Sequence, residues 1–265
     1  MIDTHAHITL DGYDGGTAGV VDRAVRAGVT HIVAIGAGGT AEEAEGAVAA
    51  ARQFVGVSAI VGIHPHDAKA VAGALWARIE AACAAPEVVA VGETGLDFHY
   101  DLSDRAVQAS VFRQHIALAR RLGKPLCIHS RNAEDETLAI LHGEGARAIG
   151  GVIHCFSGSA AFARGALDLG FCLSVPGIVT FKKAGDLPAV VQFAPADRLL
   201  IETDSPFLAP MPHRGKRNEP MYVVETLRAV AQLRGLDRGE AEAMTDANAI
   251  RLFGQRLCVR LMEMA

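Results

Sequence analysis

Five expected strands of the chain end in side chains that can ligate a metal ion. The first is Asp3-Thr4-His5-Ala6-His7, and the others end in Glu93, His129, His154 and Asp204. Histidine nitrogens and carboxylate oxygens are common ligands of divalent ions. Burying such groups without partners costs on the order of several kcal/mol each, so a shared cation is the simplest compensation. The sequence therefore predicts a metal site built from the ends of strands.

The first segment carries two of the candidate ligands at a spacing of two residues. Side chains of a strand alternate between its faces, so we expect His5 and His7 to point the same way, with Asp3 one layer below them. A lone histidine on a strand is usually structural. A pair beside an aspartate at a strand end favours metal ligation.

Glu93 follows the apolar run Val88-Val89-Ala90-Val91-Gly92 and is expected at a central strand of the fold. A carboxylate there can bridge two ions about 3.5 to 4 Å apart, which is the spacing of two-metal hydrolytic sites. The alternative is a buried ion pair with an Arg or Lys. We favour the bridge, because the residues around this strand end include no obvious basic partner.

The remaining histidines divide into one candidate for substrate contact and a group outside the site. His64 ends the third expected strand and faces the same mouth as the ligands, so we assign it a substrate role. His66 follows Pro65 and is assigned to the loop. A surface or structural role is expected for the others, which are His31, His99, His115 and His142.

Eight apolar runs of strand length alternate with segments of helical periodicity. The expected strands are Ile2–Ile8, His31–Ile35, Gly56–Ile63, Val88–Gly92, Pro125–Ile128, Gly150–Ile153, Phe171–Val175 and Leu199–Thr203. The expected helices are Thr17–Ala27, Thr40–Phe54, Leu75–Ala84, Ser103–Leu122, Glu134–Leu141, Ala160–Leu169, Asp186–Phe193 and Tyr222–Arg234. This alternation predicts an α/β protein, a (β/α)8 TIM barrel in a single domain over residues 1–265, whose strand ends converge on one mouth.

Two boundaries add local detail. Asn132 is expected to cap the helix that follows the strand ending in His129, and Gly123 to end the helix before it. Residues Arg238 to Met262 are expected to form an added helical tail.

The composition narrows the class of protein. A chain of 265 residues, half of them hydrophobic, suits one large core, and no segment of about 20 apolar residues would span a membrane. With no signal segment at its start, the protein is expected to be cytoplasmic. Five cysteines without paired spacing argue against disulfides, and the three on expected strands are interpreted as small buried hydrophobic residues. A net charge of −5 means that any polyanion must be held locally.

Six motifs occur in a fixed order along the chain. They are Asp-Thr-His-Ala-His, Gly-Ile-His-Pro-His, Gly-Glu-Thr-Gly-Leu-Asp, Ile-His-Ser-Arg-Asn-Ala, His-Cys-Phe-Ser-Gly and Glu-Thr-Asp-Ser-Pro-Phe-Leu. Together they resemble the TatD family of metal-dependent deoxyribonucleases, a branch of the amidohydrolase-like barrels, from residue 2 to about 254. The segment Asn248 to Gly254 is similar to the C-terminal signature of that family.

The resemblance implies a set of metal ligands and an activity. Two or three divalent ions (Mg²⁺, Mn²⁺ or Zn²⁺) would be bound, with Glu93 bridging, by His5, His7, Glu93, His129, His154 and Asp204. It also implies hydrolysis of phosphodiester bonds in DNA, as a 3′–5′ exonuclease acting on single-stranded ends. No membrane and no stable protein partner is indicated.

Two basic loops and one aromatic loop bear on the substrate. Arg214 to Pro220 and the region of Lys182 resemble family loops and are expected either to contact phosphates or to be solvated basic loops. The segment Phe98-His99-Tyr100 departs from the family pattern at the expected mouth, where it would alter substrate choice. Asn132 stands where relatives carry Asp.

Three residues are assigned to catalysis. We expect Asp204 to orient or deprotonate the attacking water, Glu93 to bridge the ions, and His64 to stabilise negative charge on the phosphoryl group. The alternative is an amide or ester hydrolase acting on lactones or cyclic amides, because that wider group shares the barrel. Many of its members bridge their metals with a carboxylated lysine where this chain has Glu93, which favours the nuclease. A catalytically idle binding protein would lack ligands, and none is missing.

Overall fold

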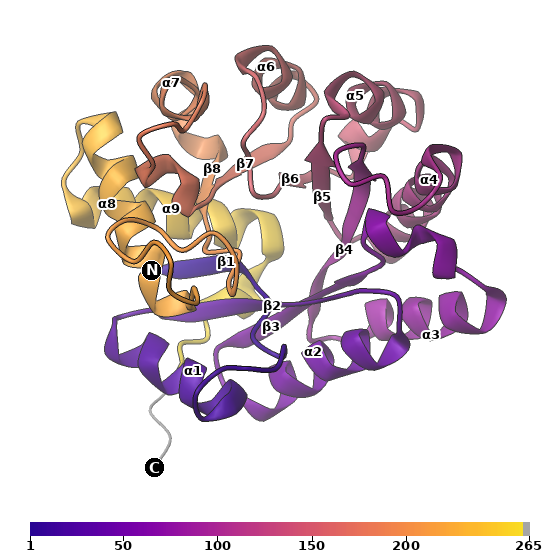
Figure 1. Cartoon of the computed structure of the whole chain (residues 1–265), viewed down its shortest axis with the longest axis horizontal. Helices are drawn as coiled ribbons and strands as arrows, with labels where there is room; N and C mark the ends of the chain where they lie inside the picture. The colour runs from indigo at the N-terminus through magenta and orange to yellow at the C-terminus, as the bar shows by residue number, and fades with distance from the viewer. Residues whose placement is uncertain (262–265) are drawn as a thin grey trace.

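The computed structural model describes residues 1–261 and shows eight parallel strands surrounded by helices (Figure 1). The strands are β1 (Ile2–Ala6), β2 (His31–Ala37), β3 (Val57–Gly62), β4 (Val88–Asp97), β5 (Leu126–Arg131), β6 (Gly151–Ile153), β7 (Cys172–Val175) and β8 (Leu199–Ile201). The helices are α1 (Gly16–Arg26), α2 (Ala41–Gln53), α3 (Gly73–Ala84), α4 (Arg105–Leu122), α5 (Glu134–Gly143), α6 (Ala160–Asp168), α7 (Leu187–Phe193), α8 (Val223–Arg234) and α9 (Arg238–Phe253). The strands follow one another in chain order around the sheet, so the predicted (β/α)8 barrel is confirmed.

The barrel closes between its first and last strands. Ala6 forms a parallel bridge with Ser205, and the backbone N–H of Asp204 donates to the carbonyl of His5 at 3.0 Å. The Thr4 hydroxyl adds a bond to the carbonyl of Ile201 at 2.9 Å. These bonds hold the residues after β8 beside β1, although they are far apart in sequence.

The core leaves only one end of the barrel open. Inward-facing residues such as Ile2, Val33 and Leu200 pack against Phe253 of α9 in one buried cluster. The N–H of Ile2, at the start of β1, donates to Asp246 of α9 at 2.8 Å. Helix α9 therefore covers the end where the strands begin, and the site can form only at the carboxyl ends.

Three strands extend beyond their predicted ends, and the first of them, β2, runs to Ala37 where Ile35 was expected. β4 was expected to stop at Gly92 and β5 at Ile128, but their pairing continues to the pair Asp97 and Arg131. Glu93 and His129 consequently lie within strands and not at their tips. The hydropathy pattern did not predict this extension, because polar residues follow each apolar run. Backbone hydrogen bonds between strands form regardless of the polarity of the side chains. In contrast, β1 and β8 are shorter than predicted.

The predicted helix boundaries hold only in part. Gly123 ends α4 in a left-handed conformation (φ 64°), as expected. Asn132 does not cap α5: the N-cap is Ala133 without a side-chain bond, and Asn132 itself has φ 54°. The tail forms α9 and a short turn of helix, and its expected end at Met262 lies outside the described residues. No helix within residues 1–261 is long and apolar enough to cross a bilayer.

Candidate metal centre at the mouth of the barrel

Glu93 lies at the centre of a cluster of histidines, and one of its oxygens faces the residues of the first strand. Oε2 lies 3.4 Å from His5 Nε2 and 3.8 Å from His7 Nε2. Asp204 Oδ1 approaches the same two nitrogens at 3.8 and 3.6 Å. Two carboxylates and two imidazoles thus converge on one small volume.

The other oxygen of Glu93 faces a second group of histidines. Oε1 lies 3.3 Å from His64 Nε2, 3.1 Å from His129 Nδ1 and 2.7 Å from His154 Nε2. No Lys or Arg within residues 1–261 forms an ion pair with Glu93, so the alternative of a buried Arg or Lys pair is not what the fold contains. All seven residues predicted for the site therefore lie together around this carboxylate.

Irregularities in two strands aim the key side chains into the mouth. The register of β1 against β2 shifts between Asp3 and Ala6, and that of β4 against β5 shifts between Gly92 and Thr94. A bulge turns a side chain that simple alternation would place on the other face. The hydroxyl groups of Thr4 and Ser174 are hydrogen-bonded inside the barrel at 3.1 Å. His5, the next residue, would face away by simple alternation, but after the register shift its side chain also faces Glu93.

The first group missed by the sequence reasoning is Asp97 with His66. The fully buried Asp97 places Oδ2 3.0 Å from His129 Nε2 and 3.0 Å from His66 Nε2. His66 lies in the connection between β3 and α3, as assigned, but it also packs against His64, with ring centroids 4.3 Å apart, so this connection reaches the cluster. The sequence signal was the last residue of Gly-Glu-Thr-Gly-Leu-Asp, an acid that remains buried only because β4 is long.

The second missed residue is Glu202, two positions before Asp204. It is fully buried, accepts the N–H of Cys155 at 2.6 Å and lies 3.5 Å from His154 Nδ1. An acidic residue directly after the apolar run of β8 was the available signal. Glu202 can orient His154, as carboxylates behind ligating histidines do.

Asp3, expected one layer below the histidines, joins the first strand to the segment before Asp204. Its carboxyl group accepts from the N–H of Thr203 at 3.0 Å and pairs with the Thr203 hydroxyl at 2.6 Å. Burial raises the pKa of Asp3 to about 8 despite these bonds. The contact fixes the segment before Asp204 to the first strand.

The donor atoms of this cluster fit a divalent cation. Among the described residues, three groups hold ligand atoms within 4.8 Å of one another: His5, His154 and Glu202; His5, His7 and Glu93; His64, Glu93 and His129. His5 Nε2, His154 Nδ1 and Glu202 Oε2 are buried and have no hydrogen-bond partner. Such groups are costly to bury unpaired, and a cation coordinated by imidazole and carboxylate would satisfy them.

The charges of the cluster keep its two carboxylates ionised. Burial would raise the pKa of Glu93, but His154 and His64 outweigh it, and the pKa lies well below its usual value. The pKa of Asp204 is lowered too, since bonding to His7 and the charges of the neighbouring histidines outweigh its burial. Glu93 and Asp204 are therefore ionised at neutral pH. Burial lowers the pKa of His5, which favours the neutral imidazole that a metal ion requires.

A TIM barrel with clustered imidazoles and carboxylates at its strand ends defines a metal-dependent hydrolase. Residues 2–254 match the model of the TatD-related DNases, and the chain belongs to that family. It is 42% identical to the uncharacterised metal-dependent hydrolase YabD of Bacillus subtilis, with 96% of this chain and 98% of that protein covered. It is also 39% identical to the 3′-5′ ssDNA/RNA exonuclease TatD of Cronobacter sakazakii, over 96% and 97%. The crystal structure of the TatD homologue YJJV of Escherichia coli superposes with a TM-score of 0.89 at 28% identity, covering 95% and 97% of the two chains.

Proposed function

We propose that this hydrolase cleaves phosphodiester bonds in DNA and removes nucleotides from the 3′ ends of single strands. The observation that carries the proposal is Glu93, whose two oxygens face two separate groups of histidines. A carboxylate in that position suits a pair of ions acting on the attacking and leaving oxygens of one phosphate. The similarity to a relative named as a 3′-5′ ssDNA/RNA exonuclease supports this choice of substrate.

Six residues would hold the metal ions, two or three in number. They are His5, His7, Glu93, His129, His154 and Asp204. Bound divalent ions would supply Lewis-acid chemistry, polarising the phosphoryl oxygens and making water acidic near neutral pH. Mg²⁺, Mn²⁺ and Zn²⁺ are all compatible with a mixed imidazole and carboxylate shell.

The chain itself supplies a base and a stabilising group. Asp204 remains ionised because its pKa is lowered, so its carboxylate can accept a hydrogen bond or a proton from the attacking water. His64 lies on the opposite, Oε1 side of Glu93, where its imidazole can stabilise negative charge developing on the phosphoryl group. Because α9 covers the other end of the barrel, substrate would enter at the carboxyl ends of the strands.

An exonuclease assay tests the proposal directly. Purified protein is incubated with a 5′-labelled single-stranded oligonucleotide, with chelator, and then with Mg²⁺, Mn²⁺ or Zn²⁺ restored. We expect stepwise shortening from the 3′ end that stops when metal is removed. Lactone and cyclic amide substrates run in parallel, and hydrolysis of these without any cleavage of DNA would make the protein an amide or ester hydrolase instead.

The Asp204→Asn variant tests the role of the base in the same assay. We expect kcat to fall by roughly 10²- to 10⁴-fold, the usual contribution of a positioned acid or base. The control is Asp168→Asn, at the exposed end of α6 and away from the mouth, which should keep the wild-type rate. A folded Asp204→Asn protein with a near-normal rate would refute this role.

A further inference from the structure

Two half-exposed aromatic rings stand on opposite sides of the mouth. Tyr100, in the loop after β4, is 54% exposed, and Phe207, in the loop after β8, is 52% exposed. Three strands separate β4 from β8 in either direction around the closed barrel, so the two loops face each other across it (Figure 1).

Each ring contacts a different half of the cluster around Glu93. Tyr100 packs edge to face with His66, with ring centroids 5.3 Å apart, on the side of Asp97 and the Oε1 histidines. Phe207 packs edge to face with His7 at 5.8 Å, on the Oε2 side. The two rings therefore flank the position where the scissile phosphate would lie.

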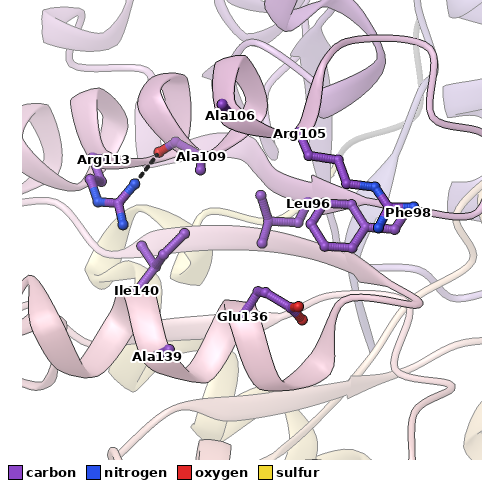
Figure 2. Close-up of a pocket in the computed structure, with 9 residues that line it drawn as sticks. All are labelled: Leu96, Phe98, Arg105, Ala106, Ala109, Arg113, Glu136, Ala139 and Ile140. Atoms are coloured by element: carbon purple, nitrogen blue, oxygen red, sulfur yellow. Dashed lines mark hydrogen bonds between the residues drawn. The ribbon is translucent and has the colours of Figure 1, made fainter.

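The exposure of Tyr100 is fixed by the structure of its loop. Asp97 Oδ1 accepts the N–H groups of His99 and Tyr100 at 3.0 and 2.8 Å. Phe98 lies at the start of the loop, and the guanidinium carbon of Arg105 is 4.2 Å from its ring centroid. Both side chains line a hollow of about 410 Å³ between α4 and α5 (Figure 2). The loop is thus anchored on both sides, and Tyr100 is held outward.

Phe207 is held by a buried amide. Asn218 is fully buried, and its Nδ2 donates to the carbonyl of Thr203 at 2.8 Å and to that of Phe207 at 2.5 Å. The N–H of Asn218 also donates to the carbonyl of Pro206 at 3.1 Å. A ring placed in this way binds a partner without a large cost in ordering the loop.

Positive charge lies beside one of the two rings and in the neighbouring basic loops. The exposed Arg131 lies over Tyr100, with its guanidinium carbon 4.9 Å from the ring centroid, and it forms no ion pair with any residue in 1–261. Arg214 lies over Phe181 at 4.1 Å and joins the basic loops after β7 and β8. An aromatic face beside a free guanidinium matches a nucleobase and the phosphate next to it.

We propose that Tyr100 and Phe207 are stacking platforms for two unpaired nucleobases, one on each side of the cleaved phosphate. This inference rests on the proposed nuclease function and names the groups that select its substrate. Bases within a duplex stack on each other and cannot reach such rings, whereas those of a single strand can. The cluster around Glu93 lies between the two rings, where the phosphate that joins two such bases would be held.

Variants at the two positions test the platforms. KM is measured for Tyr100→Ala and Phe207→Ala with a single-stranded oligonucleotide and with an abasic oligonucleotide of equal length. The preference for bases is the ratio of KM for the abasic oligonucleotide to KM for the oligonucleotide with bases. Base stacking contributes about 1 to 3 kcal/mol per base, so each alanine variant should lower this ratio by roughly 5- to 150-fold relative to wild type. Tyr100→Phe, which keeps the ring, should retain that preference. The control Val55→Ala removes an exposed side chain far from the mouth.

Each outcome decides between the two claims. If the wild-type protein cleaves DNA and both alanine variants keep its full preference for bases, the stacking role of the two rings is refuted and the nuclease function stands. The exposed rings would then contact a protein partner. Equal losses on both oligonucleotides also refute the stacking role, because damage to the cluster does not depend on bases. Wild-type protein that neither binds nor cleaves DNA overturns the proposed function together with this inference.

Discussion

Asp97 and His129 are joined by a hydrogen bond of 3.0 Å between Oδ2 and Nε2, where β4 and β5 reach the mouth of the barrel. The other nitrogen of His129, Nδ1, lies 3.1 Å from Glu93. A carboxylate behind a ligating histidine fixes its tautomer and the direction of its free nitrogen. Asp97 therefore fixes how His129 faces Glu93 in the candidate metal centre, although the sequence reasoning gave it no role.

Replacing Asp97 with Asn should weaken metal binding by about 10- to 100-fold, the usual effect of losing such a partner. Titration calorimetry with Mn²⁺ on metal-free protein measures the affinity. Asp101→Asn is the matched control, because Asp101 lies in the same loop but pairs with the exposed Arg105. Equal affinities for wild type and Asp97→Asn would show that His129 needs no support.

His115 should make the fold sensitive to acid. It is fully buried in α4, where Nε2 accepts the N–H of Ile63 at 3.0 Å and Nδ1 donates to the carbonyl of Val111 at 2.8 Å. Burial lowers its pKa from 6.5 to about 4. The unfolded chain thus binds this proton first as the pH falls, so stability is fully present above pH 6.5 and is lost progressively toward pH 4.

The His115→Gln variant keeps an acceptor for Ile63 but cannot be protonated. Between pH 6.5 and 4, its free energy of unfolding should fall less than that of wild type, by up to about 3 kcal/mol. Urea unfolding at several pH values measures the difference. The exposed His142→Gln should follow wild type, and parallel curves for wild type and His115→Gln would contradict the prediction.

Gly95 should be indispensable to the β4 strand. It adopts φ +137°, and a Cβ there would lie 2.0 Å from the carbonyl oxygen of His129. Gly95→Ala should therefore lower the free energy of unfolding by at least about 1 to 3 kcal/mol, because both the backbone and β5 must shift. Gly46→Ala in α2, where nothing lies within 4 Å of the added carbon, should stabilise by about 0.5 to 1 kcal/mol. Denaturant midpoints of the two variants should move in opposite directions, and a tolerated Gly95→Ala would refute the steric argument.

The architecture and the main site residues could be read from the sequence. Eight apolar runs separated by helical segments define the order of strands, and in a parallel barrel that order brings their carboxyl ends together. Glu93, His129, His154 and Asp204 each follow such a run, His5 lies within the first one, and the five side chains lie together in the structure. Hydrophobic burial acts locally on each run, which is why the pattern is visible in one dimension.

The tertiary structure decided which polar groups support that site. Asp97 and His66 join it because β4 continues through residues that hydropathy does not mark, and Glu202 because the start of a loop is buried. The register shifts in β1 and β4 arise from pairing with neighbouring strands, so alternation along one strand does not reveal them. The sequence alone therefore determined the order of the strands and the identity of the candidate ligands. Their orientation, their partners and the two rings across the mouth depend on contacts between segments distant in the chain, which only the closed barrel brings together.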